Sequence, residues 1–144
     1  MQIGRIDHFT LRVSPGRLPA LLAFYTNVLG LSEGDRPDFP FAGHWLYADG
    51  RPLVHLAGNA PASEAPAAPA LSTGKLNHIA FFTTGLQSAR ERLVAHGLDW
   101  QEAPVPGMPL HQIFLQDPAG LKIELTFSAA ELLQAGPSTK AAAY

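Results

Sequence analysis

The sequence contains no cysteine. That absence excludes disulfides, zinc–thiolate sites and thiol nucleophiles, and it is compatible with a reducing cytoplasm. Charge of one sign is also scarce, because the formal net charge is −2 and Lys and Arg nowhere form a run. We therefore expect neither a nucleic acid nor an anionic membrane as a partner, since both need concentrated positive charge on the protein.

Long hydrophobic runs are absent as well. No apolar run approaches the roughly 20 residues that a membrane-spanning helix needs, and the N-terminal MQIGRIDHF lacks the apolar segment of a signal peptide. With 144 residues, of which 47% are hydrophobic and 15% charged, the chain is long enough for one compact domain with a real core. We predict a soluble, cytoplasmic protein.

What the chain does contain is the same pattern twice. The strand-like segment IDHFTLRV (6–13) corresponds to LNHIAFFT (76–83), and each has a histidine as its third residue. Apolar residues at helical spacing follow each strand, in RLPALLAFYTNVLGL (17–31) and more weakly in LQSARERLVAHGLDW (86–100). The repeat indicates two copies of one structural unit.

Each copy closes with a strand–turn–strand pattern, HWLYADGRPLVHLA (44–57) in the first and HQIFLQDPAGLKIELTF (111–127) in the second. Both turns contain the Asp, Gly or Pro residues that reverse a chain. The last strand of the first copy carries His55, and the last strand of the second carries Glu124 at the matching place. We therefore predict a strand, a helix and about three strands in each copy.

The predicted boundaries follow from composition. The first unit spans residues 1–57 and the second residues 76–127, and an Ala/Pro-rich linker (58–75) without periodicity joins them within one domain. The motif SAAE (128–131) is typical of a capping box that opens a short helix. We predict that residues 128–144 form this helix and a frayed tail.

Four potential metal ligands fall on one face of the predicted strands, because residues two apart along a strand share a face. They are His8, His55, His78 and Glu124, and the opposite face in each unit is apolar. One such residue alone is more often a half-exposed polar side chain. Four at equivalent positions in two copies indicate a site for Fe(II), Mn(II), Co(II), Ni(II) or Zn(II).

The other polar and aromatic candidates carry weaker signals. We expect His44 and His111 to be strand-end histidines that face water, and the segment RPDFPFAG (36–43) to be a loop that covers the site. Four aromatic residues either line an apolar substrate pocket or pack in the core, and packing is the favoured expectation. They are Phe39, Phe41, Trp45 and Phe114.

The motifs DHFTLRV, FYTNVLGL, LNHIAFF and DPAGLKIEL resemble those of the vicinal oxygen chelate superfamily, over about residues 4–127. That superfamily includes glyoxalase I, extradiol dioxygenases, fosfomycin-resistance enzymes and bleomycin-resistance proteins. The resemblance implies an α+β fold in which two tandem βαβββ units form a cupped, eight-stranded mixed sheet with helices on the convex face. It also implies that His8, His78 and Glu124 hold a divalent metal ion.

HFTLRV and FYTNVLGL look especially like glyoxalase I. In that family an arginine at the position of Arg12 helps to bind the glutathione carboxylate, whereas the alternative for Arg12 is a solvated charge at a strand edge. Glyoxalase I has a glutamate, both ligand and acid–base group, where this chain has His55. We therefore expect His55 to be either a fourth ligand or an acid–base residue. The resemblance also implies a homodimer, with the site formed within one chain or across two.

The resemblance leaves several functions open. A divalent-metal-dependent, glyoxalase-like lyase or isomerase would act on a small carbonyl substrate through a metal-bound enediolate, with Glu124 or His55 moving the proton. An Fe(II) extradiol-type dioxygenase would use His8, His78 and Glu124 as a facial triad. A thiol transferase of the fosfomycin-resistance type is less favoured. So is a metal-free drug-binding protein, because such proteins generally lack these ligands.

Overall fold

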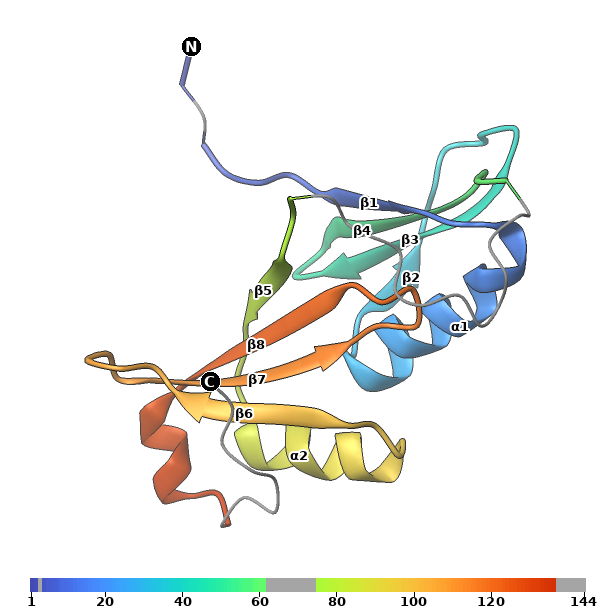
Figure 1. The fold of residues 1–144 in the computed structure, drawn as a ribbon. Coiled ribbons are helices and arrows are strands. Elements are labelled where there is room, and N and C mark those ends of the chain that lie inside the picture. Colours follow the sequence, from blue (N-terminus) through green and yellow to red (C-terminus); the bar gives the residue numbers. More distant parts are fainter. Residues whose placement is uncertain (3, 62–74, 137–144) are drawn as a thin grey trace. The chain divides into compact units, whose positions relative to one another are not determined.

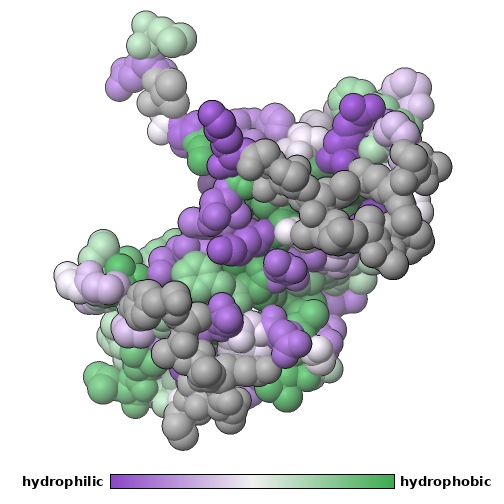
Figure 2. Space-filling view, viewed as in Figure 1, coloured by the Kyte–Doolittle hydropathy of each residue, from purple (hydrophilic) through white to green (hydrophobic). Residues whose placement is uncertain are grey.

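The computed structural model of the chain describes residues 1–2, 4–61 and 75–136. The chain forms two compact units, Met1–Pro69 and Ala70–Tyr144. Most of the predicted linker and the end of the predicted tail lie outside the described residues. No helix in the described part of the chain is long and apolar enough to cross a membrane. On the face seen in Figure 2, hydrophilic and hydrophobic side chains are interspersed.

The first unit is a four-stranded sheet with one helical segment (Figure 1). The strands run in the order β1-β4-β3-β2, with β1 parallel to β4 and the other neighbours antiparallel. The elements are β1 (Phe9–Arg12), a 3₁₀ turn (Pro15–Arg17), α1 (Leu18–Ala23), a π-helical segment (Phe24–Val28), β2 (Ser32–Gly34), β3 (Ala42–Ala48) and β4 (Arg51–Gly58).

The helix predicted over residues 17–31 is present, but it widens after α1 into the π-helical segment. It ends at Gly30, whose φ of +80° is the left-handed conformation that glycine adopts at helix C-termini. Its buried side chains pack under the sheet, because apolar residues recur at helical spacing on one side. The buried apolar residues shared by helix and strands are Leu21, Phe24, Tyr25, Val28, Leu46, Val54 and Leu56.

The second unit repeats the topology of the first, with the strand order β5-β8-β7-β6 and β5 parallel to β8. Its elements are β5 (His78–Phe82), α2 (Leu86–Ala95), β6 (Trp100–Pro104), β7 (Leu110–Gln116), β8 (Lys122–Ser128) and a 3₁₀ helix (Ala129–Leu133). The α+β class and the tandem βαβββ units predicted from the sequence are thus confirmed, and the hydrogen-bonded strands form two four-stranded sheets.

The two units also share their strand register. Thr10 of β1 lies opposite His55 of β4, and Ala80 of β5 lies opposite Glu124 of β8. His8, which directly precedes β1, stands two positions before Thr10. His78, the first residue of β5, stands two positions before Ala80. The repeat seen in the sequence is therefore a repeat of backbone pairing, and His55 and Glu124 occupy corresponding places.

A buried polar cluster lies between α2 and the strands of the second unit. Arg90 donates to Glu102 Oε2 through Nε at 3.1 Å and NH2 at 2.7 Å, and His111 Nε2 lies 2.7 Å from the same oxygen. The expectation that His111 faces water is wrong, since only 6% of it is exposed. Alternation along β7 places His111 with Ile113 and Leu115 on the buried face.

The serine of the predicted capping box caps the short helix, but Glu131 binds a different helix. Ser128 Oγ accepts a hydrogen bond from the Ala130 N–H at 3.3 Å and so caps the 3₁₀ helix. Glu131 accepts hydrogen bonds from the backbone N–H groups of Gly85 (2.7 Å) and Leu86 (2.8 Å). Its carboxylate therefore caps the first turn of α2, far away in sequence, where a negative charge is favourable.

Candidate functional site

A cleft of about 470 Å³ opens on the first unit. Residues from β1, β3 and β4 and from the loop before β3 line it. The lining residues that determine its chemistry are His8, Arg36, Phe39, Phe41, Trp45 and His55. The three aromatic residues thus line the cleft rather than the core, and the loop predicted to cover the site supplies part of the wall.

His55 lies between two other rings in this cleft. Its ring centroid is 4.0 Å from that of His8, with an interplanar angle of 18°, and 4.0 Å from that of Trp45, with an angle of 6°. Because an imidazole has two faces, the neighbours cover one face each. Only 9% of His55 is exposed, so water reaches the ring poorly.

The surroundings of His55 determine its tautomer and charge. The ring is hydrogen-bonded to the backbone of Pro52, which has no N–H, so the imidazole donates and the carbonyl accepts. Nε2 is buried and has no hydrogen-bond partner among the described residues, so we assign Nδ1 as the donor and leave the lone pair on Nε2. Burial, and then the nearby charge of His8, lower the pKa of His55. A neutral imidazole is therefore favoured.

The first-strand histidine of each unit has an oxygen acceptor in the residue before it. His8 Nδ1 lies 2.8 Å from Asp7 Oδ2, and His78 Nδ1 lies 2.9 Å from Asn77 Oδ1. The hydrogen bond to His8 is the main cause of the lowered pKa of Asp7. An acceptor at Nδ1 leaves Nε2 as the donor atom for a metal, as is usual for ligating histidines. The sequence shows these neighbours directly, as Asp7–His8 in the first copy of the repeat and Asn77–His78 in the second.

Glu124 is held by polar side chains of the second unit. Its Oε1 accepts hydrogen bonds from Gln112 Nε2 (2.6 Å) and Thr126 Oγ1 (2.8 Å), and its Oε2 lies 3.1 Å from His78 Nε2. Glu124 is 7% exposed. The sequence did not single out Gln112 of β7 or Thr126 of β8. The alternation that places Thr126 on the same strand face as Glu124 was the available signal. The two donors aim the remaining oxygen at His78.

The two pairs fit a metal ion differently. Metal–N and metal–O bonds of about 2.0–2.2 Å place neighbouring ligand atoms about 3 Å apart, and the 3.1 Å between His78 Nε2 and Glu124 Oε2 matches this spacing. A metal ion lies in the plane of each imidazole that binds it. The rings of His8 and His55 are stacked, so their planes do not meet at bonding distance, and the two rings cannot both bind one ion in this arrangement. Among residues 1–2, 4–61 and 75–136, no three or more His, Asp or Glu residues form a metal-binding group.

Arg12 does not line the first-unit cleft. Its Nε and NH2 each donate a hydrogen bond to Asn59, at 2.9 Å to the side-chain oxygen and 2.9 Å to the backbone oxygen, and the side chain is exposed. The role that the resemblance implied for Arg12 stays a prediction. The arginine that does line the cleft is Arg36.

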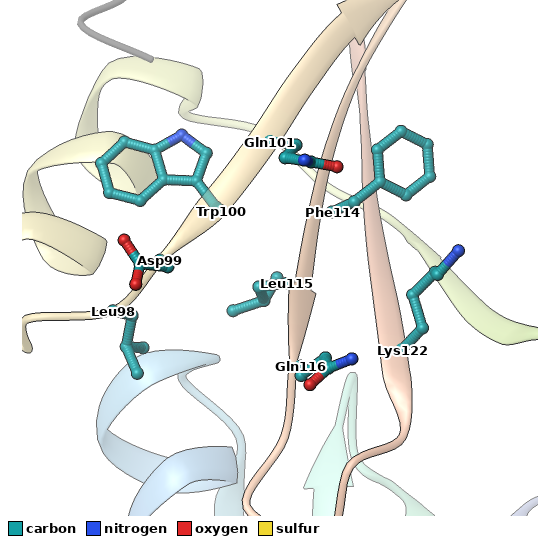
Figure 3. Close-up of a pocket in the computed structure, with 8 residues that line it drawn as sticks. All are labelled: Leu98, Asp99, Trp100, Gln101, Phe114, Leu115, Gln116 and Lys122. Carbon is teal, nitrogen blue, oxygen red and sulfur yellow. The ribbon is translucent and has the colours of Figure 1, made fainter. Parts of the chain in front are cut away.

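A second cavity, of about 620 Å³, lies on the second unit (Figure 3). Phe114 and Lys122, which line it, neighbour the ligand pair, because Phe114 is paired with Glu124 and His78 with Lys122. Figure 3 shows Phe114 and Lys122 projecting to one side of the strands and Trp100 to the other. The space beside Glu124 is thus bordered by an aromatic ring and a positive charge.

With this geometry known, comparison with other proteins identifies the family. The sequence profile of the Glyoxalase/Bleomycin resistance protein/Dioxygenase superfamily matches residues 5–125. The chain belongs to this superfamily. No curated protein matches the chain in sequence. Membership in the Glyoxalase/Bleomycin resistance protein/Dioxygenase superfamily confirms the family that the four motifs indicated.

Solved structures of other superfamily members share the fold. A glyoxalase family protein from Bacillus anthracis is 21% identical, with 89% of this chain and 98% of that chain covered and a TM-score of 0.68. The fosfomycin resistance protein FosX from Listeria monocytogenes is 21% identical, with 88% and 95% covered and a TM-score of 0.64. Lactoylglutathione lyase from Agrobacterium tumefaciens is 18% identical, with 88% and 96% covered and a TM-score of 0.63.

At these identities the likeness shows the superfamily fold alone. The superfamily includes enzymes and commonly binds divalent metals and small-molecule substrates.

Proposed function

We propose that this chain is a divalent-metal-dependent enzyme of the superfamily, a glyoxalase-like lyase or isomerase that acts on a small carbonyl substrate. The observation that carries the proposal is the shared register of the two units, which puts a potential ligand at the same two positions in each. The glyoxalase-like motifs of the sequence support the same class of chemistry.

In this proposal His8, His78 and Glu124 hold the ion. His8 and His78 each have Nδ1 occupied by an acceptor, and Glu124 has one oxygen held by two donors. The other donor atom of each residue would then bind the ion, and those of His78 and Glu124 already face each other at 3.1 Å. Second hydrogen bonds of this kind usually orient ligating side chains. The ion would supply Lewis acidity, which makes the hydrogen next to a substrate carbonyl more acidic.

We assign to His55 the transfer of that proton. A general base must be neutral at the working pH and must offer a lone pair to the substrate. His55 meets both conditions, since burial lowers its pKa and Nε2 has no partner in the described part of the chain. The alternative role as a fourth ligand requires one ring of the His8–His55 stack to rotate.

A second candidate is an Fe(II) extradiol-type dioxygenase. Two histidines and one carboxylate are the ligand set of non-haem Fe(II) oxygenases, and the aromatic wall of the first-unit cleft suits a planar substrate. Protein reconstituted anaerobically with Fe(II) should then consume O2 in the presence of catechols. If no uptake occurs across a catechol panel, this candidate is eliminated.

The decisive experiment compares His55→Gln with His96→Gln, a matched change at an exposed histidine after α2. We expect His55→Gln to keep its metal by elemental analysis and to lose about 10²- to 10⁴-fold in turnover of hemithioacetals or other carbonyl substrates with an acidic α-hydrogen. His96→Gln should match the wild type. Loss of the metal from His55→Gln would instead make His55 a ligand.

If the metal-loaded wild type turns over none of these substrates, the lyase or isomerase assignment is wrong. The homodimer and the cytoplasmic location remain predictions, the first of which sedimentation analysis tests directly.

A further inference from the structure

Arg36 occupies an unusual place in the first-unit cleft. Its guanidinium carbon lies 5.3 Å from the ring centroid of Phe39 and 5.2 Å from that of Phe41, and these two rings stack on each other at 5.4 Å. Arg36 Nη2 also donates a 2.7 Å hydrogen bond to the Phe41 carbonyl oxygen. The aromatic rings and the carbonyl therefore fix the position of the charge.

Close packing of the strands contributes to this position. A side chain at Gly43 of β3 would overlap the Leu56 carbonyl oxygen, so only glycine fits there. The same added carbon would lie 3.5 Å from Arg36 Nε. Glycine at position 43 therefore allows β3 and β4 to approach closely, and Arg36 Nε lies beside this closely packed part of the sheet.

The charge of Arg36 has no counter-ion in the described part of the chain. None of the ion pairs there involves Arg36, and its one hydrogen bond uses only one of the five N–H groups of a guanidinium. Asp7 is the acidic residue of the cleft lining, and its carboxylate is hydrogen-bonded to His8. An arginine held rigidly in a cleft with donors to spare is suited to bind carboxylate, phosphonate or phosphate oxygens.

We propose that Arg36 binds an anionic group of the substrate, and that Phe39, Phe41 and Trp45 contact an apolar, planar part attached to it. This rests on the proposed function, because the cleft is the one that contains His8 and His55. It names the substrate class as small organic anions. It also moves anion recognition from Arg12, which the glyoxalase I resemblance implied, to Arg36.

Calorimetric titration of the full chain tests the proposal with three probes of similar shape: benzoate, phenylphosphonate and neutral benzamide. We expect at least one anion to bind about tenfold or more tightly than benzamide. Tighter binding of benzoate would indicate a planar carboxylate as the preferred group, and tighter binding of phenylphosphonate a tetrahedral phosphonate. Chelator-treated protein is used alongside metal-loaded protein, so the result depends neither on the ion nor on turnover.

Four variants locate the charge. Arg36→Gln should remove the preference for the anion, Arg36→Lys should keep part of it, and Arg51→Gln, at an exposed arginine that begins β4, should leave it unchanged. Arg36→Lys also serves if Arg36→Gln does not fold, since it keeps a charge but lacks the planar fork. Arg12→Gln is the fourth, and it should retain the preference.

Several results would overturn the proposal. In the wild type, these are equal binding of benzamide and both anions, or no binding of either anion at millimolar concentration. In the variants, they are an undiminished preference for the anion in folded Arg36→Gln or in Arg36→Lys, or a preference that is lost only in Arg12→Gln. None of these outcomes bears on the metal content or the turnover of the wild type. The proposed function is therefore tested separately.

Discussion

The two units have the same topology and the same strand register, but their corresponding polar residues have opposite surroundings. In the first unit, His55 lies between two rings and is hydrogen-bonded only to a backbone carbonyl, with one nitrogen unpartnered in the described residues. In the second, Glu124 is held by two hydrogen-bond donors and lies beside His78. Backbone pairing sets where the side chain lies, and its neighbours set which of its atoms are hydrogen-bonded.

In the proposed function, this difference would give the two equivalent positions different roles. Burial, and then the nearby charge of His8, disfavour the charged form of the His55 imidazole, which suits the proposed proton transfer. Two hydrogen-bond donors hold one oxygen of the Glu124 carboxylate, and a held carboxylate suits the proposed metal binding. If the proposed function holds, a duplicated unit would thereby supply two chemical roles from one geometric position.

The largest expected effect comes from removing the charge in the second unit. Glu124→Gln should weaken metal binding about a hundredfold or more, because loss of a ligand exceeds the roughly 10- to 100-fold effect of losing a residue that orients one. The amide oxygen still accepts from Gln112 and Thr126, so the fold should survive. Metal content after dialysis measures the effect, and Glu91→Gln on the exposed side of α2 is the control. Metal retained by Glu124→Gln would place the ligand elsewhere.

A comparable change on the buried side of the second unit should affect stability alone. Glu102→Gln leaves the buried Arg90 without its charged partner, and we expect a loss of about 3–5 kcal/mol in the free energy of unfolding with metal binding intact. Glu33→Gln, which breaks an exposed pair with His44, should cost about 0–1 kcal/mol. Denaturant unfolding distinguishes the two. Equal losses would mean that burial does not matter for the Glu102 cluster.

The pH dependence of stability should reveal His55 in the first unit. Because its folded-state pKa is lowered, the unfolded chain binds the proton more tightly. Its contribution to stability is therefore complete above the ordinary histidine pKa of about 6.5 and is lost as pH falls through the lower folded value. The slope of unfolding free energy against pH in chelator-treated protein should be smaller in His55→Gln. An unchanged slope would show that His55 is not protected from protonation.

The smallest expected effect makes the two units more alike. Asp7→Asn gives His8 the same kind of acceptor that Asn77 gives His78. Since Asp7 is exposed, we expect metal affinity to change by about tenfold at most. Competition titration with a metal indicator measures the change. A loss as large as that of Glu124→Gln would make Asp7 itself a ligand.

The sequence predicted those features of the fold that repeat. Period-two and helical patterns, the strand histidines and the matched spacing to His55 and Glu124 all reflect backbone geometry, and they indicated the tandem units correctly. The sequence did not predict that His111 is buried, because β7 alternates between two faces and one polar residue does not show which face is covered. It also favoured core packing for Trp45, which instead lines the cleft.

The sequence pattern also could not predict contacts made by loop residues or between side chains of different strands. Arg36 lies in a loop without periodicity, and its importance comes from its contacts with Phe39 and Phe41. The stack of His55 with His8 depends on ring rotation, which a spacing pattern does not contain. Such features follow from three-dimensional neighbours.

Metal stoichiometry in wild type, His8→Ala and His78→Ala tests the central claim most directly, namely that corresponding positions of the two units serve one metal site. We predict one divalent ion per chain in the wild type by elemental analysis, and loss of that ion in both variants while circular dichroism stays unchanged. A wild type without metal after growth and reconstitution, or an ion that remains in either folded variant, would contradict the claim.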